Sequence, residues 1–355
     1  MTRKTPTPSQ PPTPNLQPPI PNPQSPISNS PSHIPNLKSK IQNPKSPLEA
    51  WFQPMDFTLH LATNSQAIIE AAEISFGRFG RPQPVEAADF TFRLFEHDED
   101  DGGVEEPMFH MEGHLLYQTT GRASTLVADL TAGYAFGHFS KSTLARPAFF
   151  RWHFLELAFF MMLESRGLMG VHGAALVKNG RAILLRASSG GGKTTLAYAG
   201  ARSKYQALAE DVVWLDARRK VWWGLPWSFH LLPDAKNLFP ELEPYEPILQ
   251  TNEELKLEVD LETIRAGSTT VSAQPGPVVF VERLVGGASR LEPISTADAR
   301  QAWLASRTGL ELKLPHHQDY VDSLLTDDNI YRLYFGNDVK NSVELLDLLF
   351  NFVNT

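Results

Sequence analysis

Cysteine is absent from the 355-residue chain, which excludes disulfide bonds, a thiol nucleophile and metal sites built on cysteine. Long hydrophobic runs are absent too. The longest, Phe154–Leu163, is interrupted by Glu156 and is shorter than the roughly 20 apolar residues that cross a bilayer. The first 30 residues hold no apolar core of the kind that a secretory signal needs. The sequence therefore predicts a cytoplasmic protein that does not enter a membrane.

Basic residues are scarce beyond the N-terminus. After the first 47 residues the chain carries 27 basic and 40 acidic side chains, a net charge of −13. Proteins that bind nucleic acids present surfaces rich in lysine and arginine, so this balance argues against a nucleic-acid partner. The acidic balance favours a basic acceptor only weakly. The composition does not determine the oligomeric state, and a homo-oligomer is compatible with it.

Large apolar side chains are rare in the first 48 residues, where 14 of the 28 prolines lie. This segment is rich in proline, serine, asparagine and glutamine, and it has no acidic residue. Such a composition buries too little apolar surface to offset the entropy that is lost on folding. We therefore predict a disordered, proline-rich arm over residues 1–48.

Residues 55–166 have the pattern of a small α+β region. One buried helix is predicted over Pro147–Arg166, because proline suits its first turn and apolar residues follow at helical spacing. Alternation and aromatic content predict short strands at Phe57–Ala62, Phe90–Phe95 and Leu115–Thr119.

Residues 167–355 alternate between strand and helix patterns, which predicts an α/β (α+β) domain. A strand pair is expected at Val171–Val177 and Ala182–Leu185, with Asn179-Gly180 as the hairpin turn. The pattern further predicts a helix from near Lys193, a strand ending at Ala209, a strand at Val278–Leu284, a helix capped by Ser295 and a last helix from Ser342.

The segment that says most about function is the glycine-rich loop after the second of these paired strands. Gly192-Lys193-Thr194 match the end of the phosphate-binding pattern G-x-x-x-x-G-K-[ST], and Ala187 stands in place of its first glycine. Glycines permit positive φ, so that successive N–H groups point at phosphate oxygens, and a helix N-terminus adds partial positive charge. We predict that ATP is bound by Ser188, Ser189, Gly190, Gly191, Gly192, Lys193, Thr194 and Thr195.

Two adjacent carboxylates, Glu210 and Asp211, follow the loop after one helix and one strand. In phosphoryl transfer one carboxylate holds Mg²⁺ and another accepts the proton of the attacking hydroxyl, while a loop hydroxyl such as that of Thr194 also ligates the metal. Lys193 is expected to bridge the β- and γ-phosphates. Upstream, His172 lies at a strand end, where it serves either a structural or a catalytic role.

The segments Val171–Leu176, Ser188–Thr195 and Ala209–Val212 together resemble, in order and spacing, the catalytic domain of the HPr kinase/phosphorylase family. That resemblance implies a phosphoenolpyruvate-carboxykinase-like P-loop kinase domain with a mixed sheet. It also implies that Glu210 is the catalytic base, that Asp211 lies on the metal side, and that His172 lies near the transferred phosphate.

The chain departs from the family at two places. Glu210 stands where the family has aspartate, and Val221–Leu232 stands where the bifunctional enzymes have a Glu-Ile-Arg-Gly stretch. The resemblance therefore implies a divergent serine kinase that uses ATP and Mg²⁺ and phosphorylates a peptide or protein hydroxyl. It leaves phosphorylase activity open. A nucleotide-sensing module without chemistry and a small-molecule kinase are the alternatives.

Two further groups of side chains are interpreted as structural. Trp222, Trp223 and Trp227 are assigned to core packing rather than to a platform for adenine. The pair His316-His317 follows a proline and is assigned to a loop rather than to a metal site.

Overall fold

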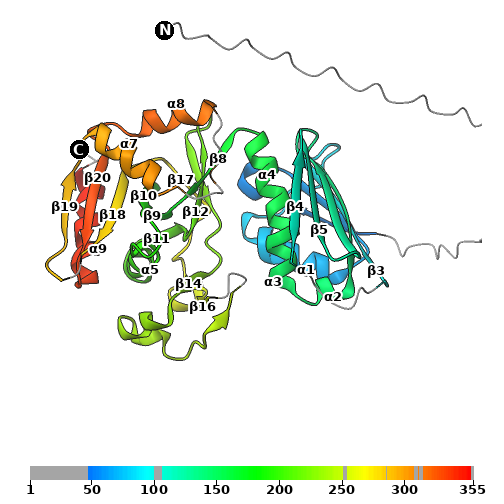
Figure 1. The fold of residues 1–355 in the computed structure, drawn as a ribbon, viewed down its shortest axis with the longest axis horizontal. Coiled ribbons are helices and arrows are strands. Elements are labelled where there is room, and N and C mark those ends of the chain that lie inside the picture. Colours follow the sequence, from blue (N-terminus) through cyan, green and yellow to red (C-terminus); the bar gives the residue numbers. More distant parts are fainter. Residues whose placement is uncertain are drawn as a thin grey trace, which may run out of the picture. The chain divides into compact units, whose positions relative to one another are not determined.

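The computed structural model describes residues 47–99, 106–250, 254–284, 286–307, 311 and 315–352. These residues form a mixed α+β fold built on several sheets (Figure 1). Of the predicted arm, residues 1–46 lie outside the described residues, whereas Leu48 begins the first strand. In the described part of the chain no helix is long and apolar enough to span a membrane.

The N-terminal region is built on one mixed sheet. Its strands are β1 (Leu48–Phe52), β2 (Leu59–Thr63), β3 (Phe90–His97), β4 (Met108–Glu112), β5 (Leu115–Thr120), β6 (Ser124–Asp129) and β7 (Tyr134–Ser140). They follow the order β1-β2-β3-β7-β6-β5-β4, with β3 parallel to both of its neighbours. The three predicted strands correspond to β2, β3 and β5, whereas the sequence patterns missed the other four.

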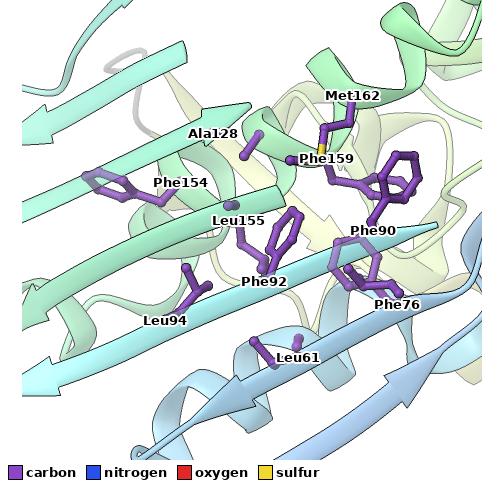
Figure 2. Close-up of a cluster of buried hydrophobic side chains, with 14 of the residues drawn as sticks. Leu61, Phe76, Phe90, Phe92, Leu94, Ala128, Phe154, Leu155, Phe159 and Met162 are labelled. Carbon is purple, nitrogen blue, oxygen red and sulfur yellow. The ribbon is translucent and has the colours of Figure 1, made fainter. Parts of the chain in front are cut away.

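Helices cover one face of this sheet. They are α1 (Gln66–Phe76), α3 (Pro147–Phe150), the π-helix η3 (Arg151–Glu156) and α4 (Leu157–Ser165), with shorter turns at η1 (Pro54–Asp56), η2 (Gly77–Phe79) and α2 (Lys141–Leu144). Figure 2 shows the core between sheet and helices, where Phe90 of β3 lies near Phe159 of α4 and Phe92 lies near Leu155 of η3. Every second residue of β3 enters this core because successive side chains of a strand point to opposite faces. The helix predicted over Pro147–Arg166 is therefore present, but it contains a π-helical stretch.

The C-terminal region contains two larger sheets. The first has the order β11-β9-β10-β18-β20-β19, and β10, β18 and β20 run parallel in it. Its strands are β9 (Ala174–Lys178), β10 (Arg181–Arg186), β11 (Gln206–Ala209), β18 (Val278–Arg283), β19 (Arg290–Pro293) and β20 (Ile330–Phe335). The second is antiparallel, with the order β17-β13-β12-β8, and consists of β8 (Leu168–His172), β12 (Val212–Asp216), β13 (Val221–Gly224) and β17 (Ser272–Ala273).

The sheet that contains β10 is buried on both faces. The helices around it are α5 (Lys193–Ser203), α7 (Thr296–Ala305), α8 (Pro315–Leu324) and α9 (Val339–Phe352). On one face Leu176 and Ile183 pack with residues of α5 and α9. On the other face Val177 and Leu184 pack with β8, β12, α7 and α8. The last helix begins three residues before the predicted start at Ser342.

A smaller insert, residues 225–264, lies between β13 and β17. It contains β14 (Phe229–Leu231), η4 (Pro233–Asn237), η5 (Pro240–Leu242), β15 (Ile248–Leu249), β16 (Leu255–Val259) and α6 (Leu261–Ile264). The strands form an antiparallel sheet of order β14-β16-β15. Phe229 and Leu231 pack in the same apolar cluster as α5, so β14 is fixed beside the helix that follows the glycine-rich loop.

The segment predicted as one strand over Val171–Val177 is two strands in different sheets, and that prediction is wrong. β8 ends at His172, Gly173 makes the crossing, and β9 begins at Ala174. A Cβ at Gly173 would lie 2.9 Å from the carbonyl oxygen of Leu185, so only glycine lets the chain cross here without a shift. Periodicity gives no sign of the crossing because apolar residues continue on both sides of it.

The hairpin predicted at Asn179-Gly180 is confirmed. β9 and β10 pair antiparallel around it, and both turn residues have positive φ, +53° and +76°. Asparagine and glycine tolerate this conformation better than other residues do, which is why the pair marks tight hairpins. The interpretation of His316-His317 as a loop is wrong, since both residues lie in α8.

A buried carboxylate connects α4 to β8 and α8. The Glu164 side chain is 7% exposed, and His317 Nε2 lies 3.6 Å from its Oε2. Its Oε1 accepts a hydrogen bond from the N–H of Gly170 at 3.1 Å. Burial raises the pKa of Glu164 to about 7; the Gly170 hydrogen bond opposes this shift and the charge of Glu311 adds to it.

Replacing Glu164 by glutamine is expected to stabilise the protein at about pH 8 and to have little effect at about pH 5. The folded state holds the Glu164 proton more tightly than the unfolded chain does. The protonated side chain therefore adds to the free energy of unfolding below pH 4.5, and this contribution is lost as the pH rises to about 7. The loss amounts to about 3 kcal/mol at most. Urea unfolding at both pH values measures it, with the exposed Glu70→Gln as control. Equal stability of Glu164→Gln and wild type at the higher pH would contradict the assignment.

Candidate functional site

The glycine-rich loop lies at the carboxyl end of β10, one of the three parallel strands, and leads directly into α5. In open α/β sheets ligands bind outside the carboxyl ends of parallel strands. Ser188, Ser189 and Gly190 are exposed in the loop, while Lys193 is buried at the start of the helix. The loop is thus open to solvent next to a helix N-terminus.

Glycines fix the path of the loop. Gly190 and Gly192 have φ of +74° and +90°, which residues with a side chain rarely adopt. A Cβ at Gly192 would lie 2.7 Å from the ring of Phe335, and one at Gly191 would lie 2.6 Å from the Cβ of Ala187. Alanine at position 187 is therefore in tight contact with the loop, which leaves no room for a side chain at Gly191.

The N-terminus of α5 presents backbone donors that are not used within the helix. The N–H of Leu196 donates to the carbonyl of Gly192 at 3.0 Å. The N–H groups of Lys193, Thr194 and Thr195 precede this bond and have no partner within the helix. They point out of its positive end, an arrangement that binds phosphate and other anions.

A line of polar contacts runs from the loop lysine to an acid. Lys193 Nζ lies 3.1 Å from His172 Nε2 and donates to the carbonyl of Ala187 at 3.2 Å. On the other side of the ring, His172 Nδ1 lies 3.1 Å from Asp211 Oδ1. A neutral imidazole satisfies both contacts, with Nδ1–H donating to Asp211 and Nε2 accepting from Lys193.

Strand pairing brings the histidine and the acid together. β8 and β12 run antiparallel with His172 opposite Val212. Asp211 directly precedes Val212, and its carbonyl accepts from the N–H of Gly173 at 2.7 Å. The structure thus joins His172, Lys193 and Asp211, which lie far apart in the sequence.

Charge and burial act against each other here. Burial lowers the pKa of Lys193, the charges of Asp211 and Glu210 oppose this effect, and that of Arg186 adds to it. Desolvation raises the pKa of Asp211, but the hydrogen bond from His172 and the charge of Lys193 outweigh it and lower the pKa. Asp211 is therefore held in its ionised form, which is the form that ligates a cation.

Glu210 lies outside this line of contacts and has a partner of its own. Its Oε2 accepts from the backbone N–H of His230 at 2.9 Å and lies 2.9 Å from the Nδ1 of the same residue. Burial lowers the pKa of His230, but the hydrogen bond and charge of Glu210 and the charge of Glu258 outweigh it and raise the pKa. Sequence reasoning missed His230, because it lies in the stretch where the family pattern ends.

A fully buried ion pair supports the backbone of His172. Arg186 Nη1 lies 3.1 Å from Glu311 Oε1, and its guanidinium stacks 3.9 Å from the ring centroid of Trp303. Arg186 also donates to the His172 carbonyl at 3.1 Å, while the His172 N–H donates to Glu311 at 3.0 Å. Both polar groups of the His172 backbone are thus bound to one pair of charges. Neither Arg186 nor Glu311 was identified from the sequence.

Thr194 and Asp211 are the predicted metal ligands. Among the described residues no group of three or more histidine or acidic side chains could hold a metal ion. Mg²⁺, however, keeps several waters and commonly takes only one or two protein groups beside phosphate oxygens. Asp211 fits this pattern because its Oδ2 has no hydrogen-bond partner in the described part of the chain. The structure shows no hydrogen bond between Asp211 and Thr194.

The tryptophans of the β13 region belong to the core. Trp222, Trp223 and Trp227 are all buried, at 0%, 6% and 9% exposure. Trp222 donates through Nε1 to the hydroxyl of Tyr320 at 3.2 Å. Their burial agrees with the packing interpretation and leaves no ring surface for a stacked base.

No protein-family model matches the chain, and no curated protein matches its sequence. Among solved structures, the Hpr(Ser) kinase/phosphatase from Coxiella burnetii is similar, with 12% identity and a TM-score of 0.27. The match covers 52% of this chain and 99% of that one. A TM-score this low assigns neither a family nor an activity.

Replacing Gly192 by alanine is expected to destabilise the protein more than Gly180→Ala does. Both glycines have positive φ, so each substitution costs about 1 kcal/mol in backbone strain. A Cβ at Gly180 meets nothing within 4 Å, whereas one at Gly192 collides with Phe335, which adds about 1–3 kcal/mol. Urea unfolding of the two variants measures the difference. Equal losses would show that the loop does not lie against Phe335.

Proposed function

We propose that the chain is an ATP- and Mg²⁺-dependent kinase of the HPr-kinase-related type, with a phosphoenolpyruvate-carboxykinase-like P-loop fold. It transfers the γ-phosphate of ATP to a hydroxyl, with a serine of a peptide or protein as the expected acceptor. The observation that carries this proposal is the line of contacts from Lys193 through His172 to Asp211, at the N-terminus of the helix that follows a glycine-rich loop.

The surroundings of Lys193 favour an anionic ligand. Its ammonium is buried, and its hydrogen-bond partners among the described residues are the Ala187 carbonyl and the His172 ring. A buried charge with neutral partners gains from binding an anion, and charge-assisted bonds to phosphate are roughly twice as strong as neutral ones. The backbone donors of the first turn of α5 add to this attraction.

The residues present also fit a magnesium ion. Asp211 and the Thr194 hydroxyl would hold it together with phosphate oxygens and water. When bound, Mg²⁺ neutralises charge that develops on the transferred phosphoryl group. His172 keeps Asp211 ionised and oriented, and at the same time accepts from Lys193, so that one ring positions both the metal ligand and the phosphate ligand.

Glu210 is the proposed base. Its carboxylate takes the proton of the acceptor hydroxyl as the hydroxyl oxygen bonds to the γ-phosphorus. The bond between that phosphorus and the β–γ bridging oxygen breaks, and ADP leaves with the electron pair. The Oε1 oxygen of Glu210 has no hydrogen-bond partner among the described residues, whereas its Oε2 is bound to His230.

Lys193→Ala is expected to abolish both ATP binding and phosphate transfer, because it removes the buried cation at the loop. Lys204→Ala, at the other end of the same helix, should leave both unchanged. The measurement uses the full chain with Mg²⁺ and γ-labelled ATP, with proteins from its own source as acceptors. Tight ATP binding by wild type without a labelled product would indicate a nucleotide sensor. A Lys193→Ala variant that still transfers phosphate would refute the proposed binding site.

Glu210→Gln is expected to keep ATP affinity and to lose roughly 10²- to 10⁴-fold in transfer rate, which is the usual contribution of a general base. Glutamine keeps the length of the side chain but cannot accept the proton. Comparing ATP affinity with the single-turnover transfer rate separates the two effects. An unchanged transfer rate would remove Glu210 from this role.

A further inference from the structure

Two bonds from one residue immobilise the Glu210 carboxylate. Both the backbone N–H and the ring Nδ1 of His230 lie 2.9 Å from the same oxygen, Oε2. The two side chains are largely buried, with 20% and 11% exposure for His230 and Glu210. The contact is therefore shielded from water and holds the carboxylate at two points.

The insert holds His230 in place. β14 pairs with β16, with His230 opposite Glu258, and the neighbours Phe229 and Leu231 are fully buried against α5. Because strand residues alternate in direction, this burial turns the His230 side chain to the other face of β14. The backbone donor to Glu210 is thus as rigid as the strand itself.

The ring of His230 is also supported from the N-terminal region. Trp152 lies in the π-helix η3, and its ring packs edge-on to the imidazole with centroids 5.9 Å apart. π-Helical turns are rare and often occur at functional sites. The turn itself is fixed, since Glu156 accepts hydrogen bonds from Arg151 at 2.8 Å and from Ser75 at 2.6 Å.

We propose that His230 is a positioning residue for the Glu210 base, an inference that rests on the kinase function proposed above. Glutamate has one more rotatable bond than aspartate, and the two bonds to Oε2 remove that freedom. They leave Oε1 as the oxygen that takes the proton of the acceptor hydroxyl. Trp152 limits rotation of the imidazole, so that Nδ1 stays directed at Oε2.

The test measures phosphate release from γ-labelled MgATP by the full chain, with water as the acceptor. The Lys193→Ala variant gives the background rate of release. His230→Ala should lower kcat by about 10- to 100-fold, the effect of a misplaced catalytic group, with KM for ATP unchanged. His230→Asn should recover much of the rate, because its amide nitrogen can replace the Nδ1 donor. Ser228→Ala is the matched control, since it breaks the bond of Ser228 to Glu258 beside β14 without touching Glu210.

A double substitution adds a second test. Glu210→Asp shortens the side chain by one methylene and so breaks its bonds to His230. In this background His230→Ala should lower the rate little further, and the two effects should not add. Wild-type turnover in His230→Ala, or an equal loss in Ser228→Ala, overturns the positioning role and leaves the kinase proposal standing. If wild type releases phosphate no faster than Lys193→Ala and also labels no acceptor in the transfer assay above, the kinase proposal is overturned, and the positioning role with it.

Discussion

The close crossing of the chain at Gly173 is the constraint on which the site depends. Before it, β8 places His172 opposite Val212, next to Glu210 and Asp211. After it, β9 pairs with β10, which ends in the glycine-rich loop. The Gly173 N–H donates to the backbone carbonyl of Asp211, and a Cβ at Gly173 would lie only 2.9 Å from the Leu185 carbonyl oxygen. Gly173 alone therefore joins β8 and β9, which belong to different sheets. This junction gives the histidine a fixed relation to both the loop and the acids.

The buried charged groups near Gly173 hold the residues of the site in place, but they make the fold less stable. An ion pair such as Arg186–Glu311 seldom stabilises a fold relative to apolar side chains of the same size. Here it binds both backbone groups of His172, so its effect is to fix the strand end. Lys193 is likewise buried with neutral hydrogen-bond partners. Local rules of stability are broken most often at functional sites, and these three charged groups lie side by side around one histidine.

Sequence patterns predicted the features that depend on neighbouring residues. The hairpin at Asn179-Gly180, the start of α5 at Lys193 and the alternation of β3 all follow from spacing over a few positions. The contacts that complete the site do not. Glu210 and His230 are 20 residues apart, and His172 and Glu311 are 139 apart. No periodicity specifies which distant side chains meet, so the partners of the predicted residues became visible only in the folded chain.

One contact joins the two places at which the sequence differs from the HPr kinase/phosphorylase pattern that it resembles. Glu210 is one methylene longer than the family's aspartate, and His230 belongs to the stretch that stands in place of the family's Glu-Ile-Arg-Gly. The glutamate carboxylate reaches the backbone N–H and the ring of His230, and both side chains are largely buried. Removing either side chain alone would leave a largely buried polar group without its partner. The contact therefore fixes the Glu210 carboxylate relative to the strand that carries His230.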